Sequence, residues 1–137
     1  MASQLNPYLT FDGNAREAME FYRSVFGGDL SITTFSEFGT TEAGLADKVM
    51  HGSLATDRGY TLMASDTAPG MTHRPGDTIT CMLSGDPGEG LEEAWEKLSA
   101  GATVTMPLEK QMWGDLYGAC VDRFGIPWMV NISQPQS

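Results

Sequence analysis

The stretch of sequence that decides the fold is residues 12–28, which reads DGNAREAMEFYRSVFGG. Its apolar side chains recur at helical spacing, at Ala15, Ala18, Met19, Tyr22, Val25 and Phe26. Asn14 precedes this stripe as a favourable N-cap residue, and Glu17 follows it as in a capping box. Gly27 and Gly28 end the stripe, because glycine adopts left-handed conformations at little cost. The pattern predicts a helix over residues 15–26 that is capped by Asn14.

The order of elements around this helix recurs later in the chain. A strand candidate at residues 5–11 precedes the helix, and a second at 78–84 precedes another apolar stripe, formed by Leu91, Ala94, Trp95 and Leu98. Gly101 ends this second stripe. Gly28 and Gly101 are 73 residues apart, as are Val25 and Leu98, so a single offset aligns the ends of the two predicted helices.

Three further strand candidates follow each predicted helix. They span residues 30–38, 48–57 and 60–65 in the first half and 103–110, 116–122 and 126–133 in the second. Short Asp/Gly turns join the last two strands of each half, as in hairpins. We therefore expect one α+β domain over residues 1–137. It consists of two βαβββ modules, at about 1–66 and 77–134, joined by a linker at 67–76 and forming one cupped, mixed, mostly antiparallel sheet.

Composition narrows the classes of partner. The net charge is −10, from 18 acidic and 8 basic residues, and such an excess repels nucleic acid and anionic membrane surfaces. No apolar run approaches the roughly 20 residues that span a bilayer, and the N-terminus lacks the pattern of a signal peptide. The two cysteines, Cys81 and Cys120, form no C-x-x-C pair. We expect a cytoplasmic protein that binds neither nucleic acid nor membrane.

Six short segments, taken together, resemble one family. They are PYLTF at 7–11, AMEFY with FGG at 18–28, VMHG at 49–52, LMASD at 62–66, WG with YG at 113–118, and DRFGIPW at 122–128. The chain resembles the PhnB-like branch of the vicinal oxygen chelate (glyoxalase/bleomycin-resistance/dioxygenase) superfamily. The resemblance implies the paired βαβββ fold and a homodimer. Members of this branch often carry a methyltransferase name, but the sequence shows no glycine-rich nucleotide loop after a first strand.

The resemblance also implies four positions at which superfamily enzymes hold a divalent metal, on the first and last strands of the two halves. These positions map onto Pro7, Met63, Thr80 and Met129, where Thr80 follows from Pro7 by the offset of 73. A proline ring cannot ligate, thioethers are poor ligands for hard or borderline divalent ions, and a single threonine hydroxyl does not hold one. We therefore expect no metal and no other cofactor. Met63 and Met129 would instead form an apolar floor.

The candidate residues for binding a small-molecule ligand are His51, Met63, Thr80, Trp113, Tyr117 and Met129. Strand alternation places Val49, His51, Ser53 and Ala55 on one face. His51 is then either a histidine that hydrogen-bonds within the sheet or a polar anchor or general base. For the methionines and aromatic residues, the alternative to ligand binding is that they fill the core. His73 lies in the linker and reads as a surface residue.

Three functions are compatible with these residues. The first is a non-catalytic small-molecule-binding protein, with acidic charge that suits a cationic ligand. The second is a metal-dependent lyase, isomerase or dioxygenase whose ligands lie elsewhere in the chain. The third is a metal-free enzyme that uses His51 with Glu37, Glu42 or Asp66, although no nucleophile–base pair stands at telling spacing. The sequence favours the first and identifies neither the ligand nor any catalytic residue.

Overall fold

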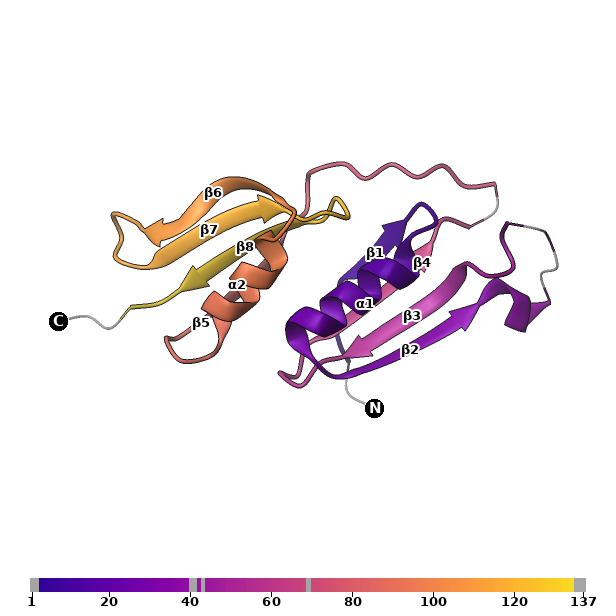
Figure 1. The fold of residues 1–137 in the computed structure, drawn as a ribbon, viewed down its shortest axis with the longest axis horizontal. Coiled ribbons are helices and arrows are strands. Elements are labelled where there is room, and N and C mark those ends of the chain that lie inside the picture. Colours follow the sequence, from indigo (N-terminus) through magenta and orange to yellow (C-terminus); the bar gives the residue numbers. More distant parts are fainter. Residues whose placement is uncertain (1–2, 40–41, 43, 69, 135–137) are drawn as a thin grey trace. The chain divides into compact units, whose positions relative to one another are not determined.

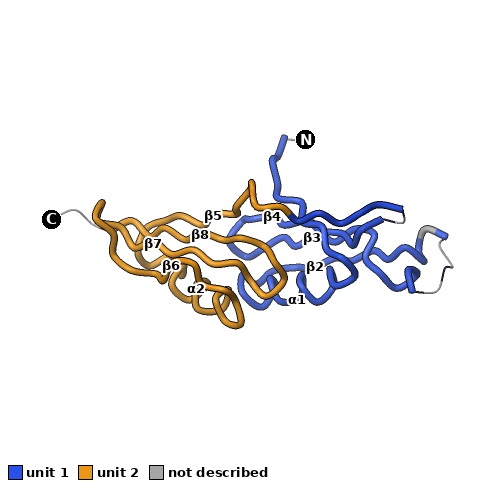
Figure 2. The backbone as a smooth tube through the Cα atoms, turned by 90° about the horizontal axis from the view of Figure 1, so that it is seen from above, with its two compact units in different colours: residues 1–75 blue, residues 76–137 orange. Residues whose placement is uncertain are grey.

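The chain divides into two compact units, residues 1–75 (unit 1) and 76–137 (unit 2), with the boundary inside the predicted linker. The structure, a computed structural model, describes residues 3–39, 42, 44–68 and 70–134. Figures 1 and 2 show the elements of each unit and the course of its backbone. None of the described helices has the length and apolar character needed to cross a bilayer.

Unit 1 contains one helix and one four-stranded sheet. Its elements are β1 (Tyr8–Phe11), α1 (Ala15–Phe26), β2 (Asp29–Thr34), the 3-10 helix η1 (Phe35–Phe38), β3 (Val49–Ala55) and β4 (Thr61–Asp66). The strand order is β1-β4-β3-β2, in which only the β1–β4 pairing is parallel. The predicted helix at 15–26 is confirmed. The predicted strand at 30–38 ends early, because η1 forms over its last four residues.

Unit 2 repeats this arrangement. Its elements are β5 (Cys81–Gly85), α2 (Leu91–Ser99), β6 (Thr103–Lys110), β7 (Leu116–Val121) and β8 (Pro127–Ile132). The strand order is β5-β8-β7-β6, and again only the outer pairing, β5–β8, is parallel. The predicted α+β architecture of two βαβββ modules is confirmed, as two four-stranded mixed sheets with one helix on each.

Each helix buries its predicted apolar stripe against one face of its own sheet. In unit 1 the whole stripe of α1 is buried, and Leu9, Phe11, Leu54, Leu62 and Ala64 complete the core. In unit 2 the stripe of α2 packs with Leu83, Trp128, Val130 and Ile132. Burying one such side chain contributes about 1.5–3 kcal/mol, so these stripes hold the helices in place. The face of each sheet opposite its helix is called the open face below.

The start of α1 is not capped as the sequence predicted. Asn14 makes no side-chain capping hydrogen bond. Instead, the buried carboxylate of Asp66, at the end of β4, accepts hydrogen bonds from the backbone N–H groups of Gly13 and Ala15, each at 2.9 Å. Its other oxygen accepts a third from the N–H of Val49 at 2.9 Å. One carboxylate thus joins the start of the helix to two strands, and the favourable charge at a helix N-terminus comes from a residue distant in sequence.

Unit 2 places its buried carboxylate in a different part of the same fold. Asp122, in the turn between β7 and β8, accepts hydrogen bonds from the backbone N–H groups of Phe124 (2.8 Å) and Ile126 (3.0 Å). Its second oxygen accepts one from the indole N–H of Trp128 at 2.9 Å. The equivalent turn of unit 1 uses Thr56, whose hydroxyl hydrogen-bonds with the backbone of Tyr60. Each unit therefore has its own polar anchor beneath the helix.

Candidate functional site

Residues in register on adjacent strands point to the same side of a sheet, and two neighbouring rows on the open face of unit 1 contain the candidate residues. The first row is Tyr8, Met63, Ser53 and Ser31; the second is Thr10, Ser65, His51 and Thr33. Two of the predicted ligand-binding residues, His51 and Met63, are thus brought onto one surface. Hydroxyl groups make up most of the remainder, so this face offers many hydrogen-bonding groups.

His51 has a partner on this face that sequence reasoning missed. The Tyr8 hydroxyl lies 3.2 Å from Nδ1 of His51, and the two ring centroids are 5.8 Å apart. Tyr8 is the in-register neighbour of Met63, so its ring spans the strand that carries Met63 to reach the histidine. The hydrogen bond fixes the orientation of the imidazole. The alternation of β1, in which Leu9 and Phe11 face the core, was the signal that could have identified Tyr8.

The open face of unit 2 has the same layout with different chemistry. One row consists of Met82, Met129, Ala119 and Met106, in register across the sheet. In the next row Tyr117 pairs with Asn131, and the Trp113 ring lies edge-on to Tyr117 with 5.9 Å between centroids. Three of the predicted residues, Trp113, Tyr117 and Met129, therefore lie on or beside this surface. Ser84 and Glu109 complete the second row, so this surface combines a thioether-rich row with a more polar one.

Strand register gives the equivalence of the two open faces, and it corrects one step of the prediction. Tyr8 pairs with Met63 and Met82 pairs with Met129, so Tyr8 is equivalent to Met82 and the offset at the first strands is 74. The predicted pairing of Pro7 with Thr80, which used an offset of 73, is wrong by one residue. The offset between equivalent residues changes along the chain for two reasons. The turn before α2 is two residues longer than the turn before α1, and α2 itself is three residues shorter than α1.

A second correction concerns β3. The register shifts between Thr33 and Thr34, which pair with His51 and Val49, and this bulge breaks the alternation. Val49 is consequently buried in the core and does not share the open face with His51. The predicted placement of His51, Ser53 and Ala55 on one face holds, since their neighbours Gly52 and Leu54 are buried on the helix side.

Two of the three candidate helpers of His51, Asp66 and Glu37, accept backbone hydrogen bonds elsewhere in unit 1. Asp66 is on the helix side, where both of its oxygens accept backbone hydrogen bonds. Glu37 accepts a hydrogen bond from the backbone N–H of Thr34 at 2.7 Å and closes the first turn of η1. Glu42 lies outside the strands, between η1 and β3. Thr80 directly precedes β5, two residues before Met82, and is exposed.

Sequence comparison agrees with this duplicated fold. A model of the family described as 3-demethylubiquinone-9 3-methyltransferase matches residues 3–131. The chain belongs to this family.

Several solved structures share the fold of this chain. Protein PA1353 from Pseudomonas aeruginosa is 35% identical, with 98% of this chain and 100% of that chain covered and a TM-score of 0.84. The PhnB protein from Bacillus cereus is 24% identical, covered over 96% and 100%, with a TM-score of 0.73. A glyoxylase/bleomycin resistance protein/dioxygenase domain from Frankia shares the fold at 15% identity, covered over 100% and 96%, with a TM-score of 0.67. The chain is therefore a PhnB-like protein with the glyoxalase/bleomycin-resistance fold.

In this PhnB-like chain, the residues at the equivalent positions of the first and last strands of each unit do not fit a divalent metal. Tyr8, Met63, Met82 and Met129 offer a phenol and three thioethers, which are poor ligands for hard or borderline divalent ions. Within residues 3–39, 42, 44–68 and 70–134, no group of three or more His, Cys, Asp or Glu side chains is placed to hold a metal ion. These four positions therefore do not supply the donor set that a divalent ion prefers.

The cysteines of this PhnB-like chain lie away from the open face. Cys81 and Cys120 flank Trp128 in register on the helix side of the unit 2 sheet. Burial raises the pKa of both thiols, and the nearby charge of Asp122 raises them further; the pKa of Cys120 reaches about 11. A thiol with a raised pKa stays protonated at neutral pH, so neither cysteine is an activated nucleophile.

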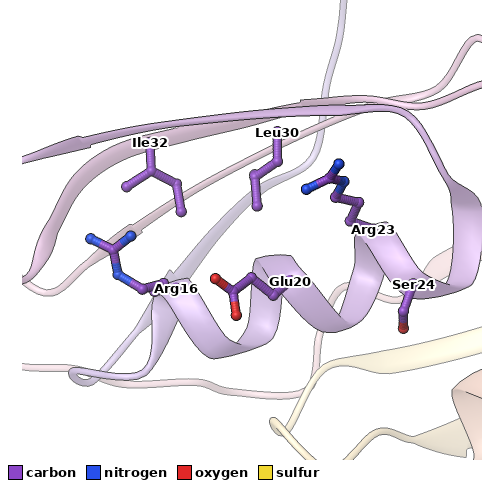
Figure 3. A pocket seen from close by; sticks show the side chains of 6 residues that line it. All are labelled: Arg16, Glu20, Arg23, Ser24, Leu30 and Ile32. Atoms are coloured by element: carbon purple, nitrogen blue, oxygen red, sulfur yellow. The ribbon is translucent and has the colours of Figure 1, made fainter.

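An open cavity of about 540 Å³ lies on the helix side of unit 1, between α1 and the edge strand β2 (Figure 3). Its lining residues are Arg16, Glu20, Arg23, Ser24, Leu30 and Ile32. None of them is among the predicted site residues. The charged side chains of α1 are exposed to solvent, and only Leu30 and Ile32 supply an apolar wall. The cavity is wide and shallow, unlike the enclosed apolar sites that bind small molecules.

Proposed function

We propose that this PhnB-like chain is a small-molecule-binding protein that works without a divalent metal. The observation that carries the proposal is the chemistry of the open faces at the strand positions. There the chain presents the Tyr8–His51 pair with Met63 in unit 1, and Met82 with Met129 in unit 2. These residues suit the capture of an organic ligand better than the coordination of a hard cation.

The two open faces would contribute differently to binding. The Tyr8–His51 pair in unit 1 combines a hydrogen-bond donor and an acceptor with fixed orientation, which suits a carbonyl or hydroxyl group of a ligand. The methionines of unit 2 adapt their shape and make favourable contacts with aromatic rings, and Trp113 and Tyr117 add flat apolar surface. The net charge of −10 favours neutral or cationic ligands over anionic ones.

The test is mass spectrometry of the protein under native conditions, after purification without denaturant, together with elemental analysis. The proposal predicts a bound organic molecule that survives treatment with a chelator, and no stoichiometric divalent metal. His51→Ala should lower retention of that molecule by about tenfold, the effect of losing one anchoring hydrogen bond of roughly 1.4 kcal/mol. The matched control is His73→Ala, which removes the remaining histidine of the chain, a residue bonded to the backbone of Thr10.

Stoichiometric divalent metal in the purified protein, with activity that chelation abolishes, would instead support a metal-dependent lyase, isomerase or dioxygenase. In that case the ligands would lie outside the strand positions named above. Equal loss of the bound molecule in His51→Ala and His73→Ala would remove His51 from the site.

We further propose that the protein acts in the cytoplasm as a homodimer. The support is that both sheets have edge strands, β2 in unit 1 and β6 in unit 2, whose outer backbone groups are available to a second copy. Light scattering at micromolar concentration should give twice the mass of the 14.8 kDa chain. A stable monomer under these conditions would refute the proposal.

A further inference from the structure

The open face of unit 2 contains three methionines in a single row. Met82 on β5 and Met129 on β8 are direct neighbours in register, and Met129 pairs in turn with Ala119 on β7. Met106 on β6 pairs with Ala119 from the other side, at a point where the β6–β7 register shifts on either side of Met106. Adjacent strands lie about 4.8 Å apart, so the row spans about 14 Å at the backbone.

Ala119 on β7 lies between Met129 on β8 and Met106 on β6, and its small side chain leaves room for their sulfur atoms to approach each other. Ala119 ends at its methyl group, so the flexible side chains of Met129 and Met106 can extend toward each other above it. Met82 needs no such space, because its strand adjoins that of Met129. Met82 is 52% exposed and Met106 is 41% exposed, so an ion from solvent can reach the row.

The equivalent row of unit 1 shows that this sulfur content is not imposed by the fold. There the four positions carry Tyr8, Met63, Ser53 and Ser31, with one thioether among hydroxyl groups. The two thiols of the chain, Cys81 and Cys120, are on the helix side of the unit 2 sheet, and burial raises their pKa values. The methionine row is therefore separate from the thiols.

We propose that unit 2 binds a soft monovalent cation, Cu(I), through the thioether sulfurs of Met82, Met129 and Met106. Neutral thioethers select Cu(I) over Zn²⁺, Mg²⁺ and other harder ions. The acidic charge of the chain favours a cation. The cation site shares Met82 and Met129 with the proposed small-molecule function, but its argument rests on the row of thioethers alone.

The test is an anaerobic titration of the full-length protein with Cu(I), in competition with a colorimetric Cu(I) chelator, and with Ag(I) as a redox-inert substitute. We expect one ion per chain, no comparable binding of Zn²⁺, and a change in tryptophan fluorescence from Trp113. The double variant Met82→Leu/Met129→Leu should weaken binding of both ions at least about tenfold, because loss of metal-site residues costs 10–100-fold or more.

Two controls make the result decisive. Met71→Leu and Met112→Leu change methionines that are 69% and 98% exposed but lie outside the row, and they should bind both ions as the native chain does. Cys81→Ala/Cys120→Ala should also leave the stoichiometry unchanged, with circular dichroism confirming the fold. Unchanged affinity in the double leucine variant, equal losses in the Met71 and Met112 variants, or loss of binding in the cysteine variant would each overturn the proposal.

Discussion

Units 1 and 2 have one topology and two surface chemistries. The strand order, the single parallel pairing and the covering helix are the same in both. The open faces differ at equivalent positions: Tyr8 and His51 in unit 1 correspond to Met82 and Tyr117 in unit 2. The core face tolerates little change, because every side chain there must fit its neighbours. The open face has no such constraint within its unit, and there the two halves have acquired different properties.

The two units also differ in the position of their buried carboxylate. Asp66 is 3% exposed and holds the start of α1, whereas Asp122 is 4% exposed and holds the β7–β8 turn. The equivalent positions in the other unit are Ile132 and Thr56, which cannot carry a charge. Each unit therefore satisfies its buried backbone groups once with a carboxylate, at a site of its own. The fold needs such an anchor but does not dictate its place.

The largest expected effect is that of Asp66→Ala. This change leaves the N–H groups of Gly13, Ala15 and Val49 without their acceptor, and the free energy of unfolding should fall by about 3–5 kcal/mol. Urea unfolding followed by circular dichroism measures it. The matched variant in unit 2 is Asp122→Ala, where two of the partners belong to the local turn, and we expect a smaller loss of about 2–3 kcal/mol. Equal losses would show that the two anchors are interchangeable.

A second comparison uses two equivalent glycines, Gly118 on β7 and Gly52 on β3. A Cβ atom on Gly118 would lie 3.0 Å from Cα of Leu108 and 3.0 Å from the Trp95 ring, whereas one on Gly52 would meet no atom closer than 3.7 Å. Gly118→Ala should therefore destabilise by about 1–3 kcal/mol through overpacking. Gly52→Ala should change stability by less than about 1 kcal/mol.

Thermal unfolding of both variants checks this prediction, with fluorescence reporting on unit 2, which contains all three tryptophans. If Gly52→Ala lost as much stability as Gly118→Ala, the result would contradict the difference in packing around the two glycines, since only Gly118 has Trp95 packed closely against it.

The sequence predicted what depends on local periodicity and missed what depends on register. The stripe in residues 15–26 defined α1 to the residue, and β6 was predicted with its observed bounds, Thr103–Lys110. Asn14 failed as the cap because Asp66, which is remote in sequence, supplies a stronger acceptor. The bulge in β3 places Val49 on the core face of the sheet. The sequence did not indicate this, because a one-residue shift in strand pairing leaves the composition unchanged.

The candidate site was predicted in part for the same reason. His51, Met63, Tyr117 and Met129 are on the open faces of their sheets, because alternation along a strand can be read from the sequence. Pro7 lies one residue before Tyr8 and Thr80 lies two residues before Met82, because a compensating change in turn and helix length hides the true offset. The Tyr8–His51 contact joins two strands that are not neighbours in the sheet, and no local pattern indicates it.

A smaller effect on stability is expected from Tyr8→Phe. The hydrogen bond to His51 is exposed to water, so its loss should cost less than about 1 kcal/mol. Nuclear magnetic resonance of the His51 ring should show greater mobility, whereas Tyr117→Phe, at the position equivalent to His51 in unit 2, should leave the His51 signals unchanged. Identical His51 spectra in the native chain and Tyr8→Phe would show that the pair does not hold in solution.

The smallest effect concerns the thiols and leaves the native structure intact. Because the pKa of folded Cys120 is about 11, alkylation by iodoacetamide at pH 8 should be slow in the native protein and fast in urea. The raised pKa of Cys120 favours the folded state below pH 9, and that contribution to stability is lost as the pH rises through about 11. Peptide mapping by mass spectrometry distinguishes Cys120 from Cys81. Rapid native labelling of Cys120 at pH 8 would refute its burial beside Trp128.

The position of Asp66 also has a consequence for the order in which the chain assembles during translation. Helix α1 leaves the ribosome with its first amide groups unsatisfied, and their acceptor is synthesised only after 51 further residues, counted from Ala15 to Asp66. An isolated helix of 12 residues is marginal in water. The nascent helix therefore becomes secure only when β4 arrives, which makes the first half of the protein a single cotranslational folding step.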